Sequence, residues 1–177
     1  NYAAIREAFG QAAALKLAAE AQIFLILSLS VLVIIAEIFM ADLILLLAPG
    51  FANTPDRLAA AVDLARVTMP YLPLISIVAL WAAIANAHDH FKAGAAAPIF
   101  ANICFIAGAV MIPFVASHLD ALRAISIAIA LLVAGFVQLI FLYLTLSRHH
   151  VIPALIWPRL SDAGRKLWRN FLPAAAG

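Results

Sequence analysis

The sequence predicts an all-α membrane protein with four transmembrane helices and an interfacial amphipathic helix. Of its 177 residues 67% are hydrophobic and only 11% are charged, and the mean hydropathy is +1.08. Soluble domains contain roughly 45–50% apolar and about 25% charged residues. A helix that crosses a bilayer needs ~20 mostly apolar residues, because its backbone groups bond internally across the hydrocarbon. Several stretches of the chain reach that length.

The first two segments are predicted from alanine content and from helix-breaking residues. Residues 1–20 are rich in alanine, the strongest helix former, and carry scattered charges, so we expect an interfacial lead-in helix. An apolar stretch at 21–47 predicts the first transmembrane helix. Pro49 and Gly50 follow it directly, and these residue types commonly end helices.

The second transmembrane helix is expected at 56–87. Thr54 followed by Pro55 is typical of a helix start, with a capping hydroxyl and proline at the first helical position. Pro70 and Pro73 lie inside the apolar part. We expect them to kink the helix, because proline has no backbone N–H to donate.

The rest of the chain predicts two more transmembrane helices and a connector. Short polar loops separate the apolar stretches at 95–117 and 124–146. Residues 147–170 form a cytoplasmic connector with an amphipathic helix, and 171–177 look like the start of a further transmembrane helix. We therefore expect the chain to be a segment of a longer protein.

The basic residues predict the orientation, because lysine and arginine stay on the cytoplasmic side of membrane helices. Grouping alternate loops puts eight basic residues on one side and three on the other. Both ends of the chain are therefore expected to be cytoplasmic. The larger group is Arg6, Lys16, Lys92, Arg148, Arg159, Arg165, Lys166 and Arg169, and the smaller group is Arg57, Arg66 and Arg123.

Two charged residues are candidates for a substrate path. A charge at membrane depth costs ~2.5–3.5 kcal/mol on insertion scales and usually faces a bundle interior or a wet cavity. Glu37 lies deep in its predicted helix, where it serves a substrate path or pairs with a polar group of a neighbouring helix. Arg66 contacts an anionic headgroup, or forms an exposed pair with Asp63 three residues earlier.

Three amides are further path candidates. Asn86, Asn102 and Gln138 lie in or at the ends of apolar stretches. Amides at such positions also hydrogen-bond between membrane helices, and that structural interpretation is favoured for all three.

A basic cluster near the end of the sequence predicts contact with lipid. Arg165, Lys166, Trp168 and Arg169 stand together just before the last apolar segment. Aromatic rings and basic side chains favour anionic headgroups, so these residues are expected to contact the inner leaflet.

The sequence offers no support for a metal site, a cofactor or an enzyme. His88, Asp89 and His90 are adjacent, so they point in different directions and lack a third ligand at fixed spacing. No phosphate-binding loop and no set of nucleophile and base is visible. A net charge of +2 does not suggest nucleic-acid binding. Cys104 alone allows no intrachain disulfide.

A series of loop and kink residues is spread over nearly the whole chain. It consists of Leu47-Ala48-Pro49-Gly50-Phe51, then Arg66, Thr68, Met69, Pro70 and Tyr71, then Asn86, Phe91, Ala97-Pro98 and Asn102, and finally Phe171-Leu172-Pro173 and Gly177. In its order and its spacing this series resembles the MurJ (MviN) lipid II flippase family.

The resemblance implies part of a two-lobe transporter of the multidrug/oligosaccharidyl-lipid/polysaccharide flippase superfamily. The chain would supply the third to sixth transmembrane helices and the start of the seventh. The implied substrate is lipid II or a related polyprenyl-linked saccharide, moved across the bacterial inner membrane by alternating access. The implied partners are membrane lipids and the remainder of the same transporter.

Three other interpretations stay open from the sequence. One is a polysaccharide or drug exporter of the same superfamily. Another is a small structural membrane subunit, whose small residues such as Gly108 and Gly135 would contact partner helices. The third is a membrane enzyme acting on lipid-linked intermediates, which would require Glu37 or the histidine cluster at 88–90.

Overall fold

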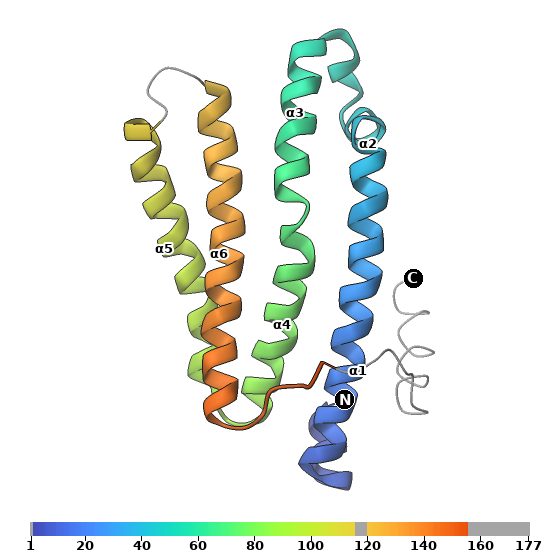
Figure 1. The fold of residues 1–177 in the computed structure, drawn as a ribbon, viewed down its shortest axis with the longest axis vertical. Coiled ribbons are helices and arrows are strands. Elements are labelled where there is room, and N and C mark those ends of the chain that lie inside the picture. The colour runs from blue at the N-terminus through green and yellow to red at the C-terminus, as the bar shows by residue number, and fades with distance from the viewer. Residues whose placement is uncertain (1, 116–119, 156–177) are drawn as a thin grey trace.

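The computed structural model describes residues 2–115 and 120–155, and within these ranges the chain is helical and contains no strand (Figure 1). The predicted fold class is confirmed: this is an all-α membrane protein. Four stretches are long and apolar enough to cross a membrane. The elements are α1 (Tyr2–Ile38), α2 (Met40–Leu47), a 3-10 helix η1 (Pro49–Asn53), α3 (Pro55–Thr68), α4 (Tyr71–Ala87), α5 (Phe91–Val115) and α6 (Asp120–Arg148).

The first helix passes the boundary expected at residue 20 and ends before the one expected at residue 47. Helix α1 continues without a break through residue 20, where we expected a lead-in helix to end. A kink at Gly10 separates the first turns of α1 from the rest of the helix. Gly10 has a φ of 85°, a conformation that glycine adopts readily because it has no Cβ. The expected span at 21–47 is divided near Phe39, after which α2 leaves the axis of α1 (Figure 1). Residues 17–20 are buried in the bundle.

The second span bends at one of its two prolines. Helix α3 ends at Thr68 and α4 starts at Tyr71, so the break lies at Pro70. The missing N–H of Pro70 leaves a carbonyl of the preceding turn without its usual partner. Pro73 lies in the first turn of α4, where a backbone N–H has no intrahelical acceptor, so the N–H that proline lacks costs no helix hydrogen bond and the helix continues through it.

The helices lie side by side in a bundle, with α4 between α1 and α6 and with α5 beside α6 (Figure 1). Helices α5 and α6 approach closely: a Cβ placed on Gly108 would lie 2.7 Å from the Cβ of Ala130. The larger buried cluster includes Trp81, Ile84 and Leu142.

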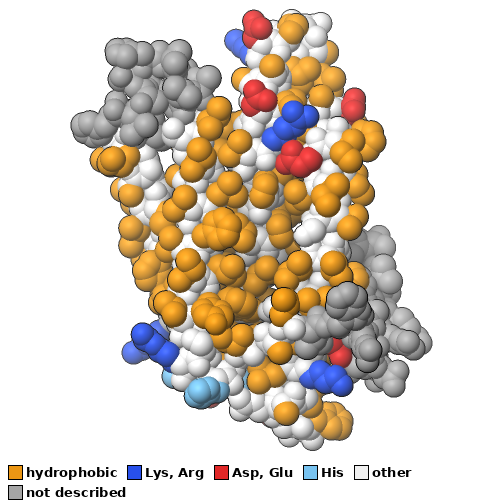
Figure 2. Space-filling view, in the orientation of Figure 1, with side chains coloured by type: hydrophobic (Ala, Val, Ile, Leu, Met, Phe, Trp, Pro, Cys, Tyr) orange, Lys and Arg blue, Asp and Glu red, His pale blue; other side chains and the backbone are white. Residues whose placement is uncertain are grey.

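Two ends of the bundle are needed for the functional argument. The histidine end comprises residues 2–22 of α1, the last turns of α4, the first turns of α5, and the last turns of α6 with residues 149–151. The η1 end comprises the last turns of α1 together with α2, η1 and α3. Figure 2 shows charged side chains toward these ends and a wide apolar belt between them. The belt includes large exposed side chains such as Val31 and Ile35, which suit contact with lipid or with further membrane helices.

Candidate functional site

The η1 end joins two of the charged candidates. Glu37 lies in the last turn of α1 and Arg66 in the last turn of α3, and Glu37 Oε2 lies 3.8 Å from Arg66 Nε. The expected pairing of Arg66 with Asp63 is wrong: among the described residues, the ion pair of Arg66 is with Glu37. The carboxylate thus pairs with a neighbouring helix, as one interpretation of the sequence held.

The Arg66 guanidinium has N–H donors that the ion pair with Glu37 does not use. The Arg66 side chain is 50% exposed and that of Glu37 is 32% exposed. An arginine carries five N–H donors in a planar fork, and the ion pair is made at Nε. The remaining donors suit a phosphate or carboxylate group. The pair lies close to both interruptions of the helices, at Phe39 and at Pro70.

The three amide candidates do not join the charged pair in one site. Gln138 is buried, and its Nε2 donates to the Ala97 carbonyl oxygen at 2.9 Å, so it links α6 to α5. Asn86 is exposed and packs over Gly94, where an added Cβ would lie 2.7 Å from Asn86 Oδ1. Asn102 is exposed on α5. A role of these amides in a substrate path stays a prediction.

One buried hydrogen bond between helices was not predicted from the sequence. Trp81 Nε1 donates to Gln22 Oε1 at 2.7 Å, and both side chains are buried between α4 and α1. Gln22 lies in an apolar stretch just as the three amide candidates do. The same rule about membrane amides could therefore have identified it, but the partner on α4 has no local signal.

The histidine end holds α1 against α4 through polar contacts. The Tyr2 hydroxyl and His88 Nε2 lie 2.9 Å apart, and the Arg6 guanidinium donates to the Ala87 carbonyl oxygen. Burial lowers the pKa of His88, and the nearby charges of Arg6 and His90 lower it further. Asp89 acts in the opposite direction. We therefore expect His88 to be neutral at physiological pH.

Two further histidines meet at this end from segments far apart in the sequence. The rings of His90 and His149 stack with centroids 3.7 Å apart and an interplanar angle of 29°. From the sequence, His90 belonged to a loop and His149 to a basic flank, and nothing indicated their contact. Among the described residues no group of three or more potential ligands could hold a metal ion.

The expected lipid-contact cluster of Arg165, Lys166, Trp168 and Arg169 lies outside the described residues. It stays a prediction.

Comparison with known proteins decides the family. The family described as "Lipid II flippase MurJ" matches residues 4–177. The chain belongs to the MurJ family. The resemblance seen in the loop and kink residues is thereby confirmed. The description of this family names a flippase.

Curated MurJ relatives are similar over most of this chain. A "Probable lipid II flippase MurJ" of Rickettsia prowazekii (strain Madrid E) is 33% identical over 155 residues, which are 86% of this chain and 30% of the relative. A protein of the same description from Rhizobium tropici is 34% identical over 130 residues, covering 73% and 24%. The "Lipid II flippase MurJ" of Burkholderia cenocepacia is 31% identical over 108 residues, covering 61% and 20%. The chain thus spans less than a third of the length of these relatives.

Proposed function

We propose that this chain forms part of a flippase that translocates lipid II across the bacterial inner membrane by alternating access. The match of residues 4–177 to the MurJ family is the observation that carries the proposal. Four helices long and apolar enough to cross a membrane support it. The chain supplies helices of one lobe, and the remainder of the transporter supplies the rest.

We propose that the histidine end faces the cytoplasm and the η1 end faces outward. Described basic residues at the histidine end include Arg6, Lys92 and Arg148, whereas Arg57 and Arg66 lie on α3 at the η1 end. Cysteine labelling tests this in a Cys104→Ala background, because Cys104 is the chain's single cysteine. A membrane-impermeant thiol reagent on intact cells should label Gly50→Cys and spare Lys92→Cys. The opposite labelling would overturn the orientation.

The Glu37–Arg66 pair supports a role of the η1 end in the substrate path. It joins α1 to α3 next to the breaks at Phe39 and Pro70, where the helices can bend. An anionic group of the substrate can replace Glu37 as the partner of Arg66, because both are charged acceptors for the guanidinium. Such an exchange would free α1 from α3 while substrate passes, which is the behaviour that alternating access requires.

A chimera tests the proposed function. The segment of a MurJ relative that corresponds to residues 4–177 is replaced by this chain, in a strain whose own flippase is under conditional control. Growth should continue after the strain's own protein is depleted. A chimera that reaches the membrane at normal levels and leaves the cells to lyse would contradict the proposal. The matched control is the relative with its own segment re-inserted through the same junctions.

A further inference from the structure

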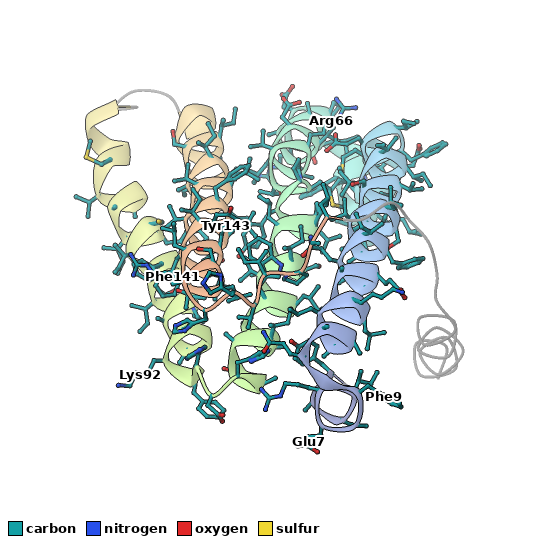
Figure 3. All side chains as sticks on the ribbon, turned by 60° about the horizontal axis from the view of Figure 1, so that its bottom comes forward. Glu7, Phe9, Arg66, Lys92, Phe141 and Tyr143 are labelled. Atoms are coloured by element: carbon teal, nitrogen blue, oxygen red, sulfur yellow. The ribbon has the colours of Figure 1, made fainter. Side chains whose placement is uncertain are left out.

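A groove opens at the histidine end between the first turns of α5 and the last turns of α6. Its volume is about 600 Å³. Its polar wall includes His90, Lys92 and His149, and its apolar wall includes Ala96 and Phe141. Figure 3 shows Lys92 projecting outward near the start of α5, and Phe141 farther along the bundle, at α6.

The polar wall of this groove suits an anion. Lys92 supplies a permanent positive charge, and the imidazoles of His90 and His149 supply N–H donors. Asp89 is the acidic residue of the lining, so cationic and donor groups outnumber it. Charge-assisted hydrogen bonds to phosphate oxygens are the strong interactions that such a wall can make.

The groove is followed along the α5–α6 pair by an aromatic contact and then by a second, apolar pocket. The rings of Phe100 and Phe141 meet across the two helices, with centroids 4.6 Å apart. The second pocket has a volume of about 350 Å³. We call the groove, the aromatic contact and this pocket together the α5–α6 crease. Its α5 positions are Ala93, Ala96, Phe100, Cys104 and Ala107, which share one helix face because each lies three or four residues from the next. Its α6 positions are Ala130, Val133, Phe141, Thr145 and His149, with an interval of eight residues between Val133 and Phe141.

The length of the crease matches one leaflet. Lys92 and Cys104 are twelve residues apart on α5, which is about 18 Å at 1.5 Å per residue. Half of a hydrocarbon core of ~30 Å is about 15 Å. A molecule with its charge at Lys92 and an acyl chain in the crease would therefore reach roughly the middle of the bilayer.

We propose that this crease binds one anionic glycerophospholipid of the cytoplasmic leaflet. Its phosphate lies among His90, Lys92 and His149, and one acyl chain follows the α5–α6 crease past Phe100 toward Cys104. The polar wall of the groove favours this occupant over another apolar helix, because an apolar helix packed there would bury the charges of Lys92 and Asp89 and leave the N–H donors of His90 and His149 without an acceptor. The inference rests on the proposed orientation, which places the groove at the anionic inner leaflet.

Native mass spectrometry of the purified full-length protein that carries this chain tests the site. The protein is titrated with phosphatidylglycerol and with phosphatidylcholine of identical acyl chains. Unaltered protein should retain phosphatidylglycerol preferentially. Lys92→Gln should lower phosphatidylglycerol occupancy about fivefold, the factor expected for removing one basic residue near an anionic lipid. Adding His149→Gln should abolish the preference.

Lys16→Gln is the matched control, because Lys16 is an exposed lysine of α1 outside the groove. It should leave the preference intact. Soluble glycerol phosphate should fail to displace the lipid, since the acyl chain provides part of the binding. Displacement by glycerol phosphate would show a free-phosphate site and overturn the lipid proposal.

Three other results would also overturn the proposal. They are equal retention of both lipids by unaltered protein, an equal loss of preference in Lys16→Gln, and no retained lipid because another segment of the protein fills the crease. The chimera experiment tests the flippase function, and the lipid titration tests the lipid site, so the two proposals can fail independently. Lost rescue with an intact lipid preference would contradict only the flippase function, and intact rescue with no preference would contradict only the lipid site.

Discussion

The two ends of the bundle are held together by different means. At the histidine end, Trp81, Ile84 and Leu142 are buried in one cluster. A buried hydrogen bond from Trp81 to Gln22 adds to this packing. At the η1 end, a smaller cluster of Ala36, Met40 and Val62 is joined by a half-exposed ion pair. The helix breaks at Phe39 and Pro70 lie next to these contacts of the η1 end. We therefore infer that the η1 end moves while the histidine end stays rigid.

The largest expected effect follows from truncating the rigid end. Trp81→Ala removes a large buried side chain and the hydrogen bond to Gln22. Replacing a buried aromatic residue by alanine costs about 3–5 kcal/mol, because a cavity remains. Thermal unfolding in detergent should show a large fall in melting temperature. A loss below about 1 kcal/mol would show that the histidine end is not the rigid part.

The next effect concerns the close contact of α5 with α6. In Gly108→Val, the added Cβ would lie 2.7 Å from the Cβ of Ala130. Both Cβ atoms are bonded directly to helix backbone, so a side-chain rotation cannot remove the clash. Overpacking of this kind costs about 1–3 kcal/mol. Gly50→Ala at the η1 end is the control, because nothing lies within 4 Å of its added Cβ. Equal melting temperatures for the two variants would contradict the close α5–α6 packing.

A smaller stability effect is expected at the ion pair. Because both side chains are partly exposed, a double-mutant cycle of Glu37→Gln and Arg66→Gln should give a coupling of about 0.2–1 kcal/mol. Growth rescue by the chimera distinguishes two roles of Arg66: joining α3 to α1 through Glu37, and contacting an anionic substrate. The charge swap Glu37→Arg with Arg66→Glu should keep the coupling but lose rescue if Arg66 contacts an anionic substrate. Full rescue by the swap would show that the pair only joins α1 to α3.

The smallest effect is a pH dependence at the histidine end. The pKa of His88 is lowered in the folded protein by burial and by the charges of Arg6 and His90, against the opposing Asp89. The unfolded chain therefore binds the proton more readily, and this contribution to stability is complete above the ordinary pKa of histidine and is lost as the pH falls through the lowered folded value. Melting temperature should fall modestly with acidification, and His88→Asn should reduce that fall. If the pH dependence of the melting temperature is unchanged in the variant, His88 is not the group responsible for it.

Local sequence signals predicted the helices better than they predicted the contacts. Apolar length and the Thr54-Pro55 start gave the second span, which the structure places at Pro55–Ala87 with its break at Pro70. The division of the first span near Phe39 has no proline or glycine to indicate it. Beyond this division α2 packs against α3, a tertiary contact that no local pattern records.

The candidate site was predictable only residue by residue. Glu37 and Arg66 were each identified from the cost of charge at membrane depth, yet their pairing depends on how α1 and α3 lie together. Spacing along one helix favoured Asp63, because i,i+3 contacts are the ones a sequence shows. The stacking of His90 on His149 joins segments far apart in the sequence and was likewise invisible.

The central claim is that this chain belongs to the machinery that moves lipid II outward. The most direct measurement is the fraction of lipid II exposed on the outer face of the inner membrane after depletion of the full-length protein that carries this chain. The account predicts that exposure falls while total lipid II rises, and that re-expression restores exposure. Unchanged outward exposure after complete depletion, in cells with no second flippase, would contradict it.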